Sequence, residues 1–181
     1  MTTIIKYITA VVLAMLALAS CNTEPSLQEY LVAKQDDSKF VKVDLPSSLL
    51  DTKQSNLDAE QKEILKTVKK MNVVAYPIKD GNEAEYRTEK QKVKTILDDE
   101  KYQLLSKLNF EGTNVTLKYV GKEDAIDEVI VLASNDTKGF TVVRLLGKNM
   151  RPEKMMQLIS SMDSSDMNTT QLNGILGMFD M

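Results

Sequence analysis

The sequence predicts a single α+β domain behind an N-terminal export signal, and three observations support this prediction. Apolar residues recur at helical spacing through much of residues 26–110, with two short strand-like runs between them. Over residues 114–146 the pattern changes, because apolar residues alternate or run continuously as they do in strands. Residues 7–19 form a separate uncharged, mostly apolar run. We expect a mixed sheet of about five strands that ends in an antiparallel meander, with helices packed on at least one face.

The N-terminal apolar run is typical of a signal peptide. It follows the positively charged Lys6 and is shorter than the roughly 20 residues that a membrane-spanning helix needs. It ends in the four residues of a bacterial lipobox pattern, Leu18, Ala19, Ser20 and Cys21. The small side chains of Ala19 and Ser20 fit the narrow subsites of a signal peptidase, and the thiol of Cys21 is the nucleophile that accepts diacylglycerol. An incidental cysteine in an ordinary signal peptide is the alternative interpretation.

Lipidation of Cys21 would divide the chain into three parts. Residues 1–20 are then the signal peptide, residues 21–25 the lipidated tether and residues 26–181 the folded domain. Two or more acyl chains, such as palmitate, anchor a protein stably, since each buried methylene contributes about 0.8 kcal/mol. Asn22 follows the cysteine in place of the aspartate that retains some lipoproteins in the inner membrane. We therefore expect the outer membrane of a bacterial cell envelope.

The composition removes several classes of chemistry. With no histidine, the chain has neither an imidazole-activated nucleophile nor an imidazole metal ligand. The one cysteine cannot close an intramolecular disulfide, and acylation would consume its thiol. The formal net charge of -3 argues against nucleic acid as a partner. We expect no cofactor and no metal, and a protein that is not an enzyme.

The domain should begin with a helix and a strand. Apolar residues at helical spacing follow Ser26, which can cap them, so a short helix is expected to end near Gln35. Residues 40–45 alternate as in a half-exposed strand, and Pro46 ends the alternation. Two further segments follow, a helix over residues 56–70 with Ser55 and Asp58 as a capping box, and a buried strand over residues 73–78.

The middle of the chain is expected to change from helix to sheet. A helix through residues 86–97 should bend at residues 98–100 and restart through residues 102–108. Three strands should follow over residues 114–120, 128–133 and 140–146, joined by short turns. The last two are nearly all apolar and should be central, whereas the alternating strands are better placed at edges or with one wet face.

The C-terminal part is rich in methionine. A helix should start at Pro152, and a last amphipathic segment should begin near Leu172. Three interpretations of the methionines remain open: core packing, a partner-binding apolar surface formed by Met155, Met156 and Met162, and ligation of Cu(I) by soft thioethers. Their helical spacing favours core packing.

Acidic clusters at residues 98–100 and 123–128 are the other candidate sites. Several carboxylates close together can suggest calcium, which prefers oxygen ligands. Neither cluster has the glycine-pivoted ligand spacing of a calcium loop, so solvated helix and turn carboxylates are the favoured interpretation.

Three strand motifs carry a family resemblance. Residues 128–132 and 140–147 form an apolar hairpin pattern, and residues 40–43 form an earlier strand. Together with the lipobox that precedes them, these motifs resemble a family of Bacteroidota lipoproteins known as domain of unknown function 4252. The resemblance implies an envelope lipoprotein without an assigned activity, and it supplies no catalytic residues.

These observations lead to one functional hypothesis and two alternatives. The anchor, together with the missing catalytic constellations, favours a non-catalytic envelope lipoprotein that binds the membrane through acylated Cys21 and an unknown envelope protein or component through its domain. A histidine-free hydrolase of envelope polymers would instead need a cleft with two convergent carboxylates of perturbed pKa. A small-ligand carrier would need an enclosed apolar pocket.

Overall fold

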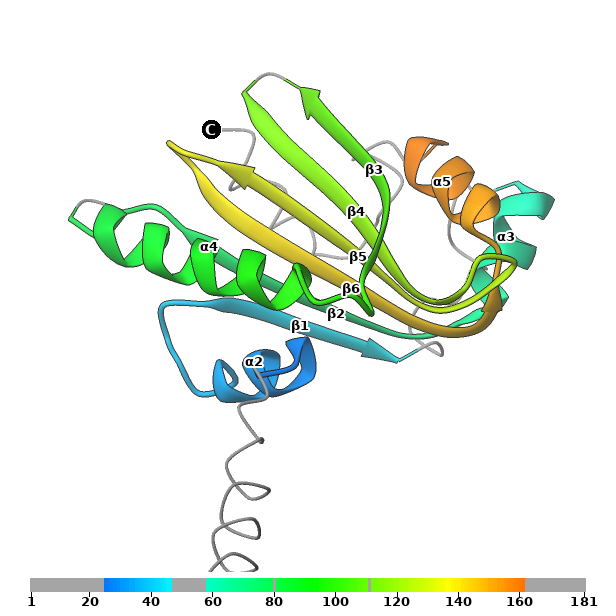
Figure 1. Ribbon diagram of the computed structural model, residues 1–181, viewed down its shortest axis with the longest axis horizontal. Coiled ribbons are helices and arrows are strands. Elements are labelled where there is room, and N and C mark those ends of the chain that lie inside the picture. Colours follow the sequence, from blue (N-terminus) through cyan, green and yellow to red (C-terminus); the bar gives the residue numbers. More distant parts are fainter. Residues whose placement is uncertain (1–24, 47–57, 80, 111, 162–181) are drawn as a thin grey trace, which may run out of the picture.

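The computed structural model describes residues 25–46, 58–79, 81–110 and 112–161, which form one antiparallel sheet flanked by helices (Figure 1). The strands are β1 (Val41–Pro46), β2 (Val68–Pro77), β3 (Gln103–Phe110), β4 (Thr113–Lys122), β5 (Ala125–Asn135) and β6 (Gly139–Met150). The helices are α2 (Leu27–Ala33), α3 (Ala59–Lys66), α4 (Glu83–Leu97) and α5 (Pro152–Ser161). The six strands lie in the order β1-β2-β6-β5-β4-β3, with each neighbouring pair antiparallel.

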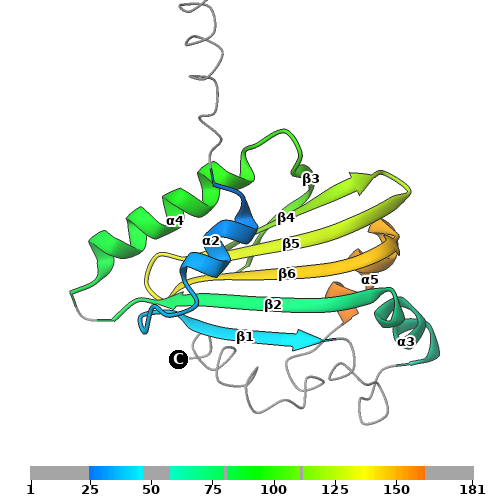
Figure 2. The same ribbon diagram turned by 90° about the horizontal axis from the view of Figure 1, so that it is seen from below.

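Helices cover both faces of the sheet (Figure 2). On one face, here called the α2–α4 face, Leu27 and Val93 of the helices pack with Val74, Ile130 and Val142 of the strands. The opposite face, called the α3–α5 face, has a separate core formed by Ile64, Met155, Val73, Val129 and Leu145, among others. The prediction of helices on at least one face is therefore confirmed, and both faces are in fact used.

The sheet itself differs from the prediction in two respects. It has six strands rather than about five, and it is antiparallel throughout rather than mixed. The meander at its end is confirmed, since β3, β4, β5 and β6 are neighbours in chain order. The two nearly apolar strands, β5 and β6, are central as expected, and β1 is an edge strand.

The extra strand is β3, where the sequence predicted that a helix restarts. A β-bulge between Leu104 and Ser106 explains the error. Because of the bulge, Leu105 packs against the α3–α5 core and Leu108 pairs with Val115 on that same face. Two apolar residues three positions apart then share one face of a strand, which reproduces the spacing of a helix. With β3 at the edge, β4 lies inside the sheet and not at its border.

The second helix is shorter than predicted. The expected helix over residues 56–70 is α3, and its capping box joins Asp58 to Gln61 rather than Ser55 to Asp58. Ser55 lies outside the described residues. The helix ends because Thr67 accepts a backbone bond from Lys148 at 3.1 Å and β2 begins at Val68, so sheet pairing replaces further helical turns.

Other boundaries agree closely with the sequence. Ser26 caps α2 in a full capping box with Glu29. The predicted helix through residues 86–97 is α4, which ends at Asp98. Lys118 donates to the last carbonyl of α4, Leu97, and so ties the helix to β4. A helix begins at Pro152 as predicted, whereas the segment near Leu172 lies outside the described residues. None of the helices in the described ranges has the length and apolarity that crossing a bilayer requires.

Candidate functional site

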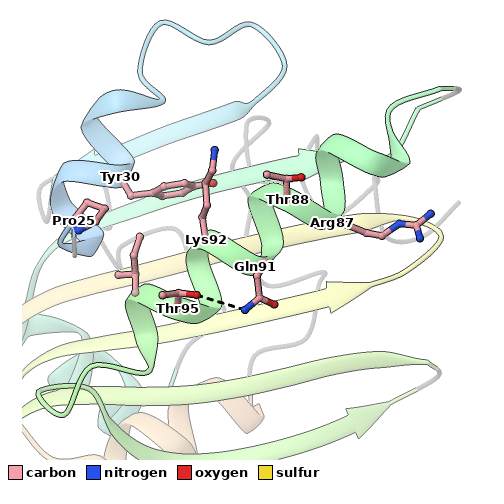
Figure 3. Close-up of a pocket in the computed structure, with 8 residues that line it drawn as sticks. Pro25, Tyr30, Arg87, Thr88, Gln91, Lys92 and Thr95 are labelled. Atoms are coloured by element: carbon pink, nitrogen blue, oxygen red, sulfur yellow. Dashed lines mark hydrogen bonds between the residues drawn. The ribbon is translucent and has the colours of Figure 1, made fainter. Parts of the chain in front are cut away.

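An open groove of about 570 Å³ lies between the start of α2 and the outer side of α4 (Figure 3). Its side chains come from two segments that are distant in sequence and that meet because α2 packs beside α4. The lining residues are Pro25, Tyr30, Arg87, Thr88, Gln91, Lys92, Thr95 and Ile96.

The position of α2 is fixed at its first turn. Ser26 accepts a hydrogen bond from the backbone N–H of Glu29 at 3.2 Å, and Glu29 accepts one from the backbone N–H of Ser26 at 2.6 Å. The next N–H, that of Leu27, donates to the hydroxyl of Tyr102 at 3.3 Å. Capping thus satisfies the backbone N–H groups of Ser26 and Glu29, and Tyr102 ties the helix start to the segment after α4.

Glu89 joins the two helices beneath the groove. Glu89 is only 4% exposed, although it belongs to a helix whose outer side is solvated. The carboxylate accepts from the Tyr30 hydroxyl at 3.0 Å and pairs with Lys34 at 3.0 Å and Lys92 at 2.8 Å. Burial alone would raise the pKa of Glu89, but the bonds from Lys92, Lys34 and Tyr30 outweigh it and hold this pKa below its ordinary value.

The groove has an apolar floor and a cationic rim. Tyr30 and Ile96 form the floor and are 5% and 3% exposed, so they offer little free apolar area. Arg87 and Lys92 are exposed at the rim, where Figure 3 shows Lys92 reaching toward Tyr30 and Arg87 extending away from it. No carboxylate belongs to the lining in this described part of the chain.

Basic side chains predominate on α4 over about two and a half turns. Four basic side chains and one acidic side chain lie between residues 87 and 95, and the acidic one is the buried Glu89. Lys90 pairs with Asp136 of the β5–β6 turn, and this bond lowers the pKa of Asp136. The basic residues are Arg87, Lys90, Lys92 and Lys94.

A buried polar cluster lies on the sheet beneath α2. The guanidinium of Arg144 donates to both carboxylate oxygens of Glu128, at 2.8 and 2.9 Å, and to Gln28 of α2. Nearby, Asn72 donates to Asp44 across the β1–β2 pair. The guanidinium and the carboxylate satisfy each other, so the cluster joins β5, β6 and α2 and leaves no free charged group for a ligand.

The lipobox residues precede the part of the chain that the structure describes. Leu18, Ala19, Ser20 and Cys21 lie outside the described residues, which begin at Pro25. Pro25 itself lines the groove, so the predicted tether enters the domain at this site.

The three methionines of the possible partner surface separate, and Met155 agrees with the favoured interpretation of core packing. Met155 is fully buried in the core of the α3–α5 face, so its side chain packs inside the domain and is not on the surface. Met156 is half-buried, and Met162 lies outside the described residues.

The acidic clusters also separate. Asp98, Asp99 and Glu100 are exposed after α4, and Asp99 pairs with Lys101 at 3.8 Å. In the second cluster the acidic residues Glu123, Asp124 and Asp127 are exposed, whereas Glu128 is buried against Arg144. Among the described residues, no group of three or more acidic or thiol side chains is arranged to hold a metal ion.

The sequence reasoning missed both Glu89 and the groove. A signal for Glu89 was present, because a carboxylate stands within the apolar stripe of α4, three residues after Tyr86 and four before Val93. The pairing of Glu128 with Arg144 also had a signal, since each charge interrupts or borders a nearly apolar strand. The groove had none, because its two sides are distant in sequence.

Comparison with protein families gives one match. Residues 30–175 match the family described as Domain of unknown function (DUF4252). This range includes all six strands of the sheet and most of α2. Searches of curated proteins and of solved structures found no match.

Proposed function

Because the chain belongs to the DUF4252 family, we propose that it is a bacterial envelope lipoprotein, anchored by acylated Cys21, whose α+β domain is a non-catalytic binding module. The domain then binds an envelope protein or another envelope component. The outer membrane is its proposed location, because Asn22 follows the cysteine in place of the aspartate that retains some lipoproteins in the inner membrane.

One observation carries this proposal, the lipobox pattern that ends at Cys21 directly after an uncharged apolar run. The spacing to the domain supports it. Pro25 is already part of the groove between α2 and α4, so only three residues stand between the cysteine and the described domain. A tether this short keeps the domain at the bilayer surface.

The chemistry of the groove supports binding over catalysis. Its lining contains hydroxyl, amide and cationic side chains and no carboxylate in the described part of the chain. Among the described residues, the three carboxylates with a shifted pKa are Glu29 of α2, Glu89 beneath the groove and Asp136 of the β5–β6 turn, and in each of them hydrogen bonds hold the pKa below its ordinary value. A general acid needs the opposite shift, so the described residues offer no observation that favours a carboxylate hydrolase.

Lipidation is tested by expressing the full chain in a bacterium that processes lipoproteins. The wild type is expected in the membrane fraction with a lipid-modified N-terminal cysteine, detected by mass spectrometry of the N-terminal peptide. Cys21→Ser has no thiol to alkylate, so it should lack both the lipid and the cleavage after residue 20.

Thr23→Ser is the matched control, because it changes a neighbouring residue and leaves the cysteine in place. It should be processed like the wild type. A Cys21→Ser protein that is still cleaved and still membrane-bound would show that the anchor does not depend on this cysteine.

A further inference from the structure

The groove lies at the point where the proposed tether enters the domain. Pro25 lines it, and Cys21 precedes Pro25 by four residues. At 3.3–3.6 Å per residue, the two Cα atoms are at most about 14 Å apart. Electrostatic interactions with a membrane surface act over about 10 Å at 0.1 M salt. A lipid on Cys21 would therefore hold this groove within or close to the range of the bilayer's surface charge.

The charges around the groove are suited to an anionic surface. Arg87 and Lys92 stand on its rim, and none of the ion pairs among the described side chains uses Arg87. The ammonium of Lys92 has three N–H donors, and one of them bonds Glu89 at 2.8 Å, so two remain for a ligand. The exposed acidic residues 98–100 follow α4 and do not line the groove.

The small exposed area of the groove floor indicates which part of a lipid can bind there. Tyr30 and Ile96 are 5% and 3% exposed, so an acyl chain would bury little apolar surface there. Separate phosphates of a lipid surface can instead meet the guanidinium of Arg87 and the ammonium of Lys92, which point apart from each other on the rim (Figure 3). The charged rim is therefore the part of the groove that is suited to a lipid headgroup.

We infer that the α2–α4 groove faces the bilayer and that Arg87 and Lys92 bind the phosphates of anionic lipid headgroups. This inference rests on the proposed anchor at Cys21 and adds to it the orientation of the domain. In this orientation the α2–α4 face lies toward the membrane, and the α3–α5 face, on the opposite side of the sheet in Figure 2, lies away from it.

Lysine labelling tests this orientation without adding a cysteine. The lipidated full chain is reconstituted in vesicles of phosphatidylethanolamine and phosphatidylglycerol, and separately in vesicles of phosphatidylcholine alone. Each sample is acetylated briefly, and the labelling rates of Lys92, Lys122 and Lys148 are measured by mass spectrometry. The last two are exposed and lie outside the groove, so they report general accessibility.

Lys92 should react more slowly in the anionic vesicles than in the neutral ones, while Lys122 and Lys148 react equally in both. Arg87→Gln should raise the rate at Lys92 in anionic vesicles about fivefold, the factor that corresponds to one basic charge near such a surface. This variant leaves every bond of Glu89 in place, so the fold is not at risk. Lys122→Gln is the matched control and should change nothing.

Equal labelling of Lys92 in the two vesicles, with Cys21 lipidated, would overturn the orientation and leave the anchor standing. The same labelling can be done on the membrane fraction of the cells. Slow labelling of Lys92 there, but fast labelling in anionic lipid vesicles, would also overturn the inference, because a protein partner would then cover the groove. If Cys21 carries no lipid in the processed chain, the anchor fails and this inference fails with it.

Discussion

At the scale of single residues, Glu89 has the largest consequences. Its carboxylate is buried beneath the groove and binds Tyr30, Lys34 and Lys92 from two helices. Lys34 also lies over the ring of Phe40, with its Nζ 4.8 Å from the ring centroid. A buried charge with several partners is costly to disturb, because its removal leaves those partners without their bonds.

Glu89→Gln should lower the free energy of unfolding by about 1–3 kcal/mol, since a neutral amide replaces a charge that holds two lysines and a hydroxyl. Urea denaturation followed by circular dichroism measures the change. Glu85→Gln is the matched control on the same helix, because its pair with Lys39 is exposed, and it should cost clearly less stability than Glu89→Gln. An equal loss in both variants would contradict the role given to Glu89.

The contribution of Glu89 should also depend on pH. Its pKa in the folded protein lies below the ordinary 4.5, so the unfolded chain takes up the proton first as the pH falls. The stabilisation is therefore fully present above pH 4.5 and is lost as the pH falls through the folded pKa. The difference in unfolding free energy between wild type and Glu89→Gln should shrink as the pH falls below 4.5 and through the folded pKa. A constant difference would show that the charge is not its source.

At the scale of elements, the pairing of β2 with β6 depends on one glycine. Gly139 begins β6 with a φ of +130° and pairs with Pro77. A Cβ at this position would lie 2.9 Å from the Cα of Pro77 and would also strike the carbonyl of Tyr76. The sequence marks this glycine only as part of a turn, because the close approach comes from a strand that lies more than sixty residues earlier.

Gly139→Ala should destabilise the protein by about 3 kcal/mol or more, because backbone strain and a clash with β2 act together. Gly81→Ala is the control, since Gly81 also has a positive φ, of +86°, but no atom within 4 Å of its Cβ position. It should cost only about 1–2 kcal/mol, from backbone strain alone. Urea denaturation of the two variants side by side measures the difference, and equal losses would mean that contact with β2 contributes nothing.

At the scale of the whole molecule, the sheet separates two cores. Leu27 belongs to the core of the α2–α4 face and Met155 to that of the α3–α5 face, and both side chains are fully buried. Because the sheet lies between them, a cavity at one site removes no packing atoms at the other. Their effects on stability should therefore be independent.

Leu27→Ala and Met155→Ala should each cost about 2–5 kcal/mol, and the double variant should equal their sum within about 0.5 kcal/mol. Ile64→Ala with Met155→Ala is the comparison, since α3 and α5 contact each other on one face and a larger coupling is expected there. Urea denaturation of all five variants measures both couplings. A coupling across the sheet as large as that within one face would refute the separation of the cores.

Local patterns predicted most of the fold correctly. The cap at Ser26, the start of α5 at Pro152 and the central apolar strands β5 and β6 all follow from neighbouring residues. The prediction was wrong at β3, where a bulge gave strand residues a helical spacing, and at the start of β2, where pairing with β6 ended a helix early. Both errors occur where a distant strand decides the local conformation.

The sequence by itself determined the family, the α+β class and the candidate anchor at Cys21, because each depends on composition or on residues close together in the chain. Only the tertiary structure decided that Met155 is core, that Glu89 joins two helices, and that Pro25 and Arg87 border one groove. The physical reason is that burial and charge pairing depend on which segments pack together in the fold. A local sequence pattern does not show that two residues about sixty positions apart will be in contact.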